Sequence, residues 1–248
     1  MVAQDSSTPP AYAFTDEDEG ATEEADRFKQ GKNGFGAGAH FHTYGLGFDL
    51  VYFRQFKDRP RLEQLFTFSF GNVKDRREAK EPSIYASQGG TEFIYDKEHY
   101  LYFFTLNYGA QYTILNQTPF NRLSLKGGFS TGPMLPILKP YMVQIAEPIS
   151  STQAVVVTRA WDPNRYSYFD VVGEADFFEG SGNATVHFGW RMRAHLTLNI
   201  AGRPVFVRAV HMGVQADVYN KPMRLMGRLD DKQVFWGGFL GLLLGNSW

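Results

Sequence analysis

Hydrophobic and small residues alternate along residues 234–248, the last stretch of the chain. Every second position from Val234 is mostly bulky and apolar, with an aromatic residue near each end, and the positions between them are mostly small. A period of two residues indicates a β-strand. In a half-buried strand of a soluble sandwich one face would be polar, and here it is not. The pattern fits a strand whose bulky face contacts lipid while its small face points into a filled lumen.

The same alternation recurs upstream and predicts eight strands in all. The clearest is 100–114, where tyrosine, phenylalanine and leucine alternate with threonine, asparagine and glycine. The weakest signal is the turn at Tyr44-Gly45, without which 34–57 is one strand and the count is seven. Pro133 and Pro136 lack the N–H that a ladder needs, so we expect a bulge or the barrel rim there. The predicted strands are 34–43, 46–56, 62–71, 100–114, 123–130, 184–200, 206–218 and 234–248.

The connections between these strands alternate in length. Short turns follow the second, fourth and sixth strands, whereas long loops at 75–96, 139–182 and 221–233 follow the third, fifth and seventh. This order is typical of outer-membrane barrels, which have short periplasmic turns and longer outer loops. A soluble barrel with the apolar face inside is the alternative, but an eight-stranded interior is too narrow for Phe104, Tyr108 and Trp190 together. The predicted fold class is therefore all-β, an eight-stranded antiparallel transmembrane β-barrel of the smallest outer-membrane size.

The N-terminal residues lack this pattern. Residues 1–33 are rich in acidic side chains and poor in apolar ones, which predicts a disordered periplasmic arm ahead of a barrel domain at 34–248. The first residues have neither the charged nor the apolar region of a signal peptide. Since an exported barrel needs one, we expect the signal peptide to be missing from this numbering or already removed.

The amino-acid composition excludes several classes of function. The net charge of −1 gives no reason to expect a nucleic-acid partner, and the absence of cysteine excludes disulfides and thiol chemistry. The sequence has no run of 18 or more apolar residues, so no transmembrane helix is predicted. The mean hydropathy of −0.32 does not argue against a barrel, because lipid-facing and lumen-facing residues average out. No phosphate-binding glycine motif is present, so no cofactor is expected.

Several short motifs carry a family resemblance. They are the run 107–112 (Asn-Tyr-Gly-Ala-Gln-Tyr), the glycine-rich run 127–133, the segment 138–141 (Leu-Lys-Pro-Tyr), the segment 178–180 (Phe-Glu-Gly) and the glycine-rich last strand. From about residue 34 to 248 the chain resembles uncharacterised outer-membrane β-barrel proteins of Bacteroidota. The resemblance implies the bacterial outer membrane, with its lipid and lipopolysaccharide as partners, but no established activity. The terminal Trp248 resembles the insertion signal that barrel-insertion machinery recognises.

Charged residues fall on the face predicted to line the lumen. Turn lengths decide which residues face each other across strands. They predict five facing pairs: His40 with Asp49, Gln55 with Glu63, Gln111 with Lys126, His187 with Asp217, and Arg193 with His211. Buried charges must be paired, so we expect a lumen plugged by ion pairs, with a gated pore or a catalytic site as alternatives. The predicted network is His40, Asp49, Glu63, Lys126, His187, Arg191, Arg193, His195, His211 and Asp217.

Two arrangements resemble catalytic or metal chemistry. His40 and His42 share one strand face, as a metal site would need, but no third ligand is evident and we predict no metal. His187 and Asp217 could form a general base and its orienting carboxylate, but no serine lies in a nucleophile motif. The protein is therefore predicted not to be an enzyme.

Aromatic residues in the longest loop are the better binding candidates, because loops on a rigid scaffold carry recognition. They are Trp161, Tyr166, Tyr168 and Phe169. The alternative is that these rings pack on their own loop or belong to an interfacial girdle. The predicted function is a structural or interaction protein, for example a subunit of an outer-membrane complex, that presents extracellular loops. A narrow pore for ions or small solutes and a membrane-embedded enzyme at the barrel rim are the rivals.

Overall fold

A computed structural model describes residues 32–116, 123–150, 153–200, 206–227 and 231–248, with side chains from 209 in the fourth range. The predicted acidic arm lies almost wholly outside these residues and stays a prediction. The turns expected at 117–120 and 201–203 also lie outside them. Within the described ranges, no helix is long and apolar enough to cross a membrane.

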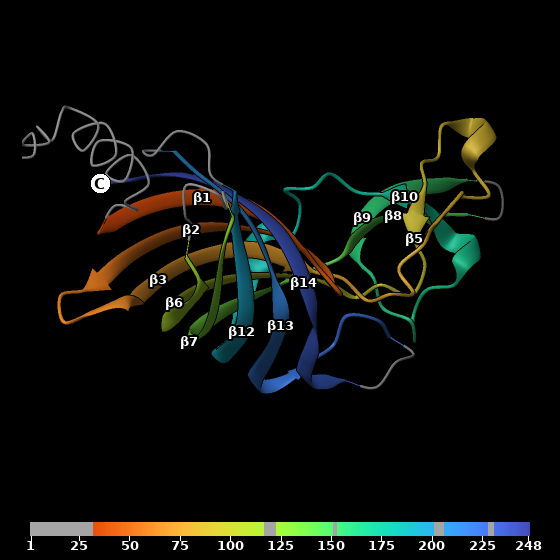
Figure 1. Cartoon of the computed structure of the whole chain (residues 1–248). Coiled ribbons are helices and arrows are strands. Elements are labelled where there is room, and N and C mark those ends of the chain that lie inside the picture. Colours follow the sequence, from red (N-terminus) through yellow and green to blue (C-terminus); the bar gives the residue numbers. More distant parts are fainter. Residues whose placement is uncertain (1–31, 117–122, 151–152, 201–205, 228–230) are drawn as a thin grey trace, which may run out of the picture.

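Eight strands of the described chain form a closed antiparallel ring (Figure 1). Each strand pairs with the next along the ring, and β14 returns to β1 in a ladder that runs from Gly34 opposite Ser247 to His42 opposite Phe239. Closure leaves this sheet without a free edge. The ring confirms the predicted fold class. Its strands are β1 (Asn33–His42), β2 (Gly45–Phe56), β3 (Arg59–Val73), β6 (His99–Leu115), β7 (Leu123–Pro140), β12 (Gly189–Ile200), β13 (Phe206–Met223) and β14 (Lys232–Ser247).

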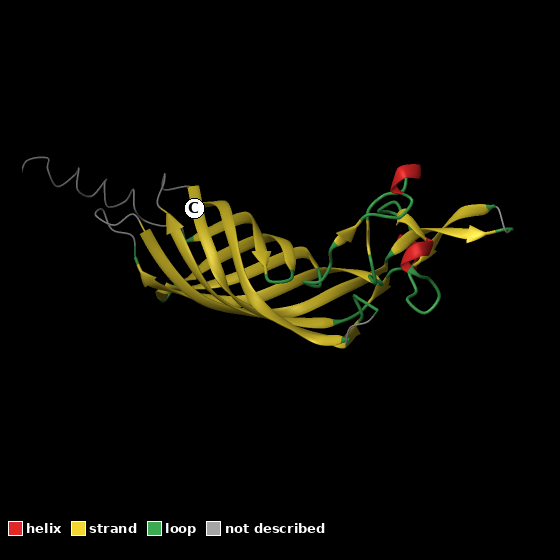
Figure 2. Ribbon diagram, turned by 90° about the vertical axis from the view of Figure 1, so that its right-hand side faces the viewer, coloured by secondary structure: helices red, strands yellow, loops and turns green. Residues whose placement is uncertain are grey.

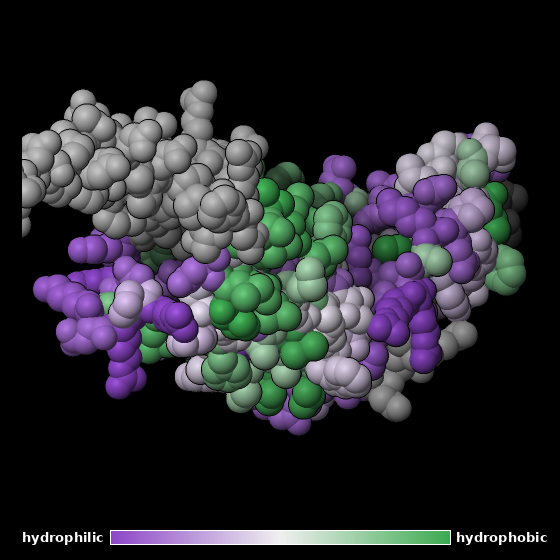
Figure 3. Space-filling model, viewed as in Figure 1, coloured by the Kyte–Doolittle hydropathy of each residue, from purple (hydrophilic) through white to green (hydrophobic). Residues whose placement is uncertain are grey.

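Side chains alternate between the two faces of the ring as the sequence predicts. On β14, Leu242 is 64% exposed on the outside, whereas its neighbours Gly241 and Leu243 are buried inside. On the face shown in Figure 3, hydrophobic residues lie between hydrophilic ends. A transmembrane barrel needs such a band, because lipid offers no partner for polar groups.

The bulge predicted at Pro133 and Pro136 is absent, whereas the ladder between β7 and β12 ends at Met134, between the two prolines. Strand β7 continues to Pro140, and its register against β6 is the same on both sides, with Thr131 opposite Tyr108 and Met134 opposite Thr105. The β6–β7 ladder omits Gly132 and Pro133 and then resumes. The missing N–H therefore interrupts the pairing locally, as expected for proline, without changing the residue count.

The segments 75–96 and 139–182, predicted only as long loops, contain short strands and 3-10 helices. They form a small outer domain that extends from one end of the barrel (Figure 2). It contains a three-stranded sheet, in which β8 (Met142–Pro148) lies between β9 (Ala154–Ala160) and β10 (Val171–Glu174). The smaller elements are β4 (Lys80–Glu81), η1 (Ala86–Gln88), β5 (Phe93–Ile94), η2 (Tyr168–Asp170), η3 (Ser181–Asn183) and β11 (Thr185–Val186), which pairs with β7. Strands this short are easily missed, since periodicity needs a longer window.

An apolar core of its own holds the outer domain together. Its buried side chains come from both loops: Phe93, Ile94, Tyr141, Val143, Ile145, Trp161 and Val171. The Tyr141 hydroxyl accepts a 2.9 Å hydrogen bond from the Ile94 backbone N–H, which ties the two loops to each other. Below this core, Lys97 is fully buried and pairs with Glu78. Burial lowers the pKa of Lys97, and the Glu78 carboxylate opposes that shift.

Candidate functional site

The strand registers correct four of the five predicted lumen pairs. Only Gln55 lies opposite Glu63 as expected. The first turn is at 43–44 rather than 44–45, so His40 faces Gly47 and not Asp49. The other facing pairs that differ are Gln111 with Gly128, Arg191 with Asp217 and Arg193 with Gln215. In each of these four pairs the observed partner lies two or four residues from the predicted one, so it is on the same face of its strand. The period of two fixes the face of a strand but leaves its register to the turns.

The centre of the lumen is built around the carboxylate of Asp49, which is fully buried. Arg193 Nη1 lies 3.2 Å from Asp49 Oδ1, and His40 Nδ1 lies 2.7 Å from Asp49 Oδ2. Arg193 Nη2 lies 3.0 Å from His40 Nε2. Because a guanidinium only donates, His40 Nε2 accepts and its Nδ1 carries the proton toward Asp49. His40 is therefore neutral, and the charges of Arg193 and Asp49 neutralise each other.

Two further ion pairs lie in the lumen. Arg191 Nε and Nη2 each donate a 2.6 Å hydrogen bond to Asp217, and the guanidinium lies 3.9 Å from the centre of the Phe103 ring. Lys126 Nζ lies 2.7 and 2.9 Å from the two oxygens of Glu63. With Asp49 and Arg193, the described lumen holds three cationic side chains and three carboxylates. This balance is what burial of charge demands, because an unpaired charge there is strongly destabilising.

Glycines make room for the imidazole rings. A Cβ at Gly241 on β14 would lie 2.5 Å from His211 Nε2, and one at Gly47 would lie 2.4 Å from His40 Cε1. Both distances are too short for any side chain without movement of the rings. The small residues of the inward face are therefore needed for this packing, as expected for a narrow lumen.

We predict that Gly241→Ala destabilises the barrel by about 1–3 kcal/mol, because overpacking forces the rings out of position. The matched control is Gly238→Ala on the same strand, where an added Cβ faces outward and meets nothing closer than 3.6 Å. Urea unfolding of both variants in detergent measures the difference. Equal stability of the two variants would show that the rings are not tightly packed against Gly241.

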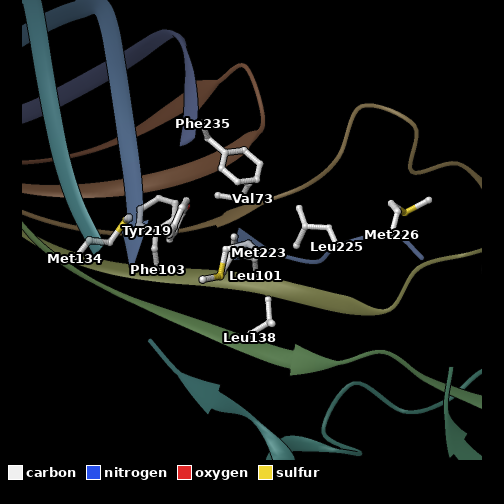
Figure 4. Close-up of a cluster of buried hydrophobic side chains, with 10 residues drawn as sticks. All are labelled: Val73, Leu101, Phe103, Met134, Leu138, Tyr219, Met223, Leu225, Met226 and Phe235. Atoms are coloured by element: carbon white, nitrogen blue, oxygen red, sulfur yellow. The ribbon is translucent and has the colours of Figure 1, made fainter. Parts of the chain in front are cut away.

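Apolar layers lie on both sides of the Asp49 and Asp217 ion pairs. Glu63 lies two residues past Leu65 toward the far end of β3. At the end nearest the outer domain lies the lid layer, shown in Figure 4: Val73, Leu101, Phe103, Met134, Leu138, Tyr219, Met223, Leu225, Met226 and Phe235. At the opposite end lies the lower layer: Val51, Phe53, Leu65, Ala209 and Leu243. The cavity beside the charges measures about 40 Å³, room for about three waters.

A metal-like grouping is present but already holds a cation. Ligand atoms of His40, Asp49 and His211 lie within 4.8 Å of one another, whereas His42 is not part of the group. The guanidinium of Arg193 contacts both His40 and Asp49. A metal ion would have to displace this guanidinium and cross an apolar layer to enter. The geometry therefore favours an ion-pair plug over a metal centre.

The remaining predicted site residues are dispersed. His187 lies outside the lumen, where its Nε2 is 3.3 Å from Thr185 Oγ1, so it forms no dyad with Asp217. His195 faces the lumen cavity. Trp161 is a core residue of the outer domain, only 5% exposed, which corrects its prediction as a binding residue. Tyr166 and Tyr168 are partly buried against the same core, and Phe169 is 66% exposed.

The lid layer is the feature that the sequence reading missed. Its signal was present, since Phe103 and Phe235 are large residues on the otherwise small inward face of their strands. They lie near the ends of β6 and β14 that lead to the long loops.

The Trp248 backbone exchanges hydrogen bonds with Asn33 at the other end of the barrel.

The fold is that of a small transmembrane β-barrel. No family model matches the chain, and no curated protein does either. Among solved structures, the chain is similar to Ail, the attachment invasion locus protein of Yersinia pestis, at 11% identity, with 88% of this chain and 99% of that chain covered and a TM-score of 0.41. It is also similar to Neisserial surface protein A (NspA) at 10% identity, with 88% and 97% covered and a TM-score of 0.41.

A second structure of Ail, in complex with the heparin analogue sucrose octasulfate, aligns at 11% identity and a TM-score of 0.40, with 88% and 99% covered. Likeness at this level gives no basis for transferring a ligand or an activity. The resemblance to proteins of Bacteroidota gains no support from these comparisons.

Proposed function

We propose that the protein resides in a bacterial outer membrane, with its lumen permanently filled, and acts through its outer domain as a structural or interaction protein. The observation that carries this proposal is the closed, charge-balanced lumen beneath a folded domain that extends beyond the hydrophobic band (Figures 2 and 3). Outer-membrane lipid and lipopolysaccharide surround the band, and Trp248 serves the insertion machinery. An outer-membrane complex is the setting in which such a domain would find a partner.

A pore is disfavoured because ions would have to cross both apolar layers. We predict no steady single-channel conductance in planar bilayers. Insertion is verified in the same preparation by the altered gel mobility of the unheated, folded barrel. Discrete, long-lived open-channel currents from inserted protein would reject the plug and favour the pore.

The rim enzyme is also disfavoured. Both oxygens of Asp217 accept hydrogen bonds from Arg191, and the facing register places it away from His187. A general base needs an orienting partner and a nucleophile within hydrogen-bond reach. Among the described residues at the rim, His187 has no orienting carboxylate.

Strand β9 is the part of the outer domain best suited to bind a partner. It pairs with β8 on one side only, so the backbone groups of its other edge have no strand partner within the described chain. Its side chains are exposed or partly exposed along the whole strand, including Val155 and Val156. An open edge of this kind accepts an additional strand from another protein.

We predict that Val156→Lys abolishes partner binding, because a charge on an edge strand blocks strand addition while leaving the pairing with β8 intact. The control is Ile84→Lys, which adds the same charge at another exposed apolar residue outside β9. The measurement is chemical cross-linking in native outer membranes followed by mass spectrometry. A partner lost with Val156→Lys and kept with Ile84→Lys supports the edge. A partner retained by both, or cross-links to none, contradicts it.

A further inference from the structure

The turn between β2 and β3 concentrates positive charge at the end of the barrel opposite the outer domain (Figure 1). Arg54, Lys57, Arg59 and Arg61 lie within eight positions, with Asp58 as the single acidic residue among them. All four cations are exposed. In Figure 3 this end appears as a hydrophilic region next to the hydrophobic band.

The four cations are not neutralised by any carboxylate that the structure describes. Across the described residues, none of the four forms an ion pair with a carboxylate, although Asp58 is a close neighbour in sequence. Like charges crowded in one turn repel each other. Their arrangement therefore favours an external anion at this rim.

A hollow of about 370 Å³ lies at the same turn, lined by Arg59, Pro60, Arg61, Leu62 and Tyr112. Leu62 and Tyr112 face each other across β3 and β6 on the outer face of the barrel. The side chain of Gln55 donates a hydrogen bond to the backbone oxygen of Pro60, which holds the turn in place. The hollow thus has two guanidinium groups beside an apolar wall that continues into the hydrophobic band.

We propose that this rim site binds an anionic glycerophospholipid of the adjacent leaflet. Arg59 and Arg61 hold the headgroup phosphate, which guanidinium groups bind through paired N–H donors. Leu62 and Tyr112 contact the glycerol and the first part of an acyl chain, as aromatic and apolar residues do at a membrane interface. Because the wall is apolar, the fitting ligand has hydrocarbon next to its phosphate. The inference rests on the membrane location proposed above.

Short-chain dioctanoyl-phosphatidylglycerol is the probe, titrated into the folded full-length protein in neutral detergent and followed by native mass spectrometry. We expect adducts with phosphatidylglycerol and few with dioctanoyl-phosphatidylcholine. Arg59→Gln/Arg61→Gln should weaken binding about tenfold or more, since each basic residue near an anionic lipid contributes appreciably. The matched control is Arg76→Gln/Arg77→Gln, which removes the same charge at the other end of the barrel.

Three outcomes would overturn the site. Equal binding of the two lipids removes the role of headgroup charge. Equal weakening by both double variants reduces the effect to net charge. If inorganic phosphate displaces phosphatidylglycerol at an equal concentration, the site binds a free anion rather than a lipid. Insertion into phosphatidylcholine vesicles, measured by gel mobility, tests the membrane location separately. If the protein inserts but shows no lipid preference, the lipid site is rejected and the membrane location is kept.

Discussion

Replacing Asp217 by asparagine is expected to destabilise the barrel by about 3–5 kcal/mol, the cost of leaving a buried charge without its partner. Arg191 is fully buried and donates two of its hydrogen bonds to this carboxylate. The uncharged amide cannot compensate the guanidinium charge. Urea unfolding in detergent, followed by tryptophan fluorescence, gives the change in the free energy of unfolding.

The double variant Arg191→Met/Asp217→Leu separates loss of pairing from loss of packing. Removing both charges leaves no buried ion, so the double variant should be close to the wild type in stability or above it. A stability of Asp217→Asn within about 1 kcal/mol of the wild type would mean that water reaches Arg191. In that case the lumen around Arg191 is open to solvent.

Replacing Leu242 by arginine is expected to cost about 2–4 kcal/mol, because the new charge faces hydrocarbon near the middle of the membrane. Leu242 lies on the outer face of β14, midway between Trp236 and Trp248, and all three side chains are exposed. Refolding into lipid vesicles over a urea series measures the loss.

The control for this prediction is Asn246→Arg on the same face of the same strand. Asn246 is already polar, exposed and close to the end of β14, where an arginine should cost only about 0–1 kcal/mol. If the two substitutions had equal effects, the stability of β14 would not depend on depth. The outer face would then contact water rather than lipid.

The faces of the strands could be predicted from the sequence, but their pairing could not. A period of two residues identifies the inward side of β12 whatever its register, so Arg191 and Arg193 were placed correctly in the lumen. Which residue Asp217 faces depends on the turn that precedes β13, and hydrophobic alternation contains no information on that length. For this reason His187 was assigned to a site from which the structure excludes it.

The outer domain could not be predicted from the sequence for a different reason. Its strands are short, and β9 is exposed or partly exposed on both faces, so it shows no alternation of apolar and polar positions. Trp161 was expected as an exposed loop residue because aromatic loop residues commonly serve recognition. In the fold it belongs to a core that also includes Phe93 and Ile94 from the other long loop. Contacts of this kind depend on tertiary structure and leave no local pattern.

Accessibility of spin labels along β14 in lipid vesicles tests the central claim most directly. Labels at Leu240, Leu242 and Leu244 should collide with membrane-dissolved oxygen, whereas labels at Phe239 and Leu243 should be shielded from oxygen and from a water-soluble nickel reagent. This result would show the apolar side chains in hydrocarbon and an interior closed to bulk solvent. Exposure of the three leucine positions to the nickel reagent would contradict the membrane barrel, and exposure of Phe239 and Leu243 to it would contradict the closed lumen.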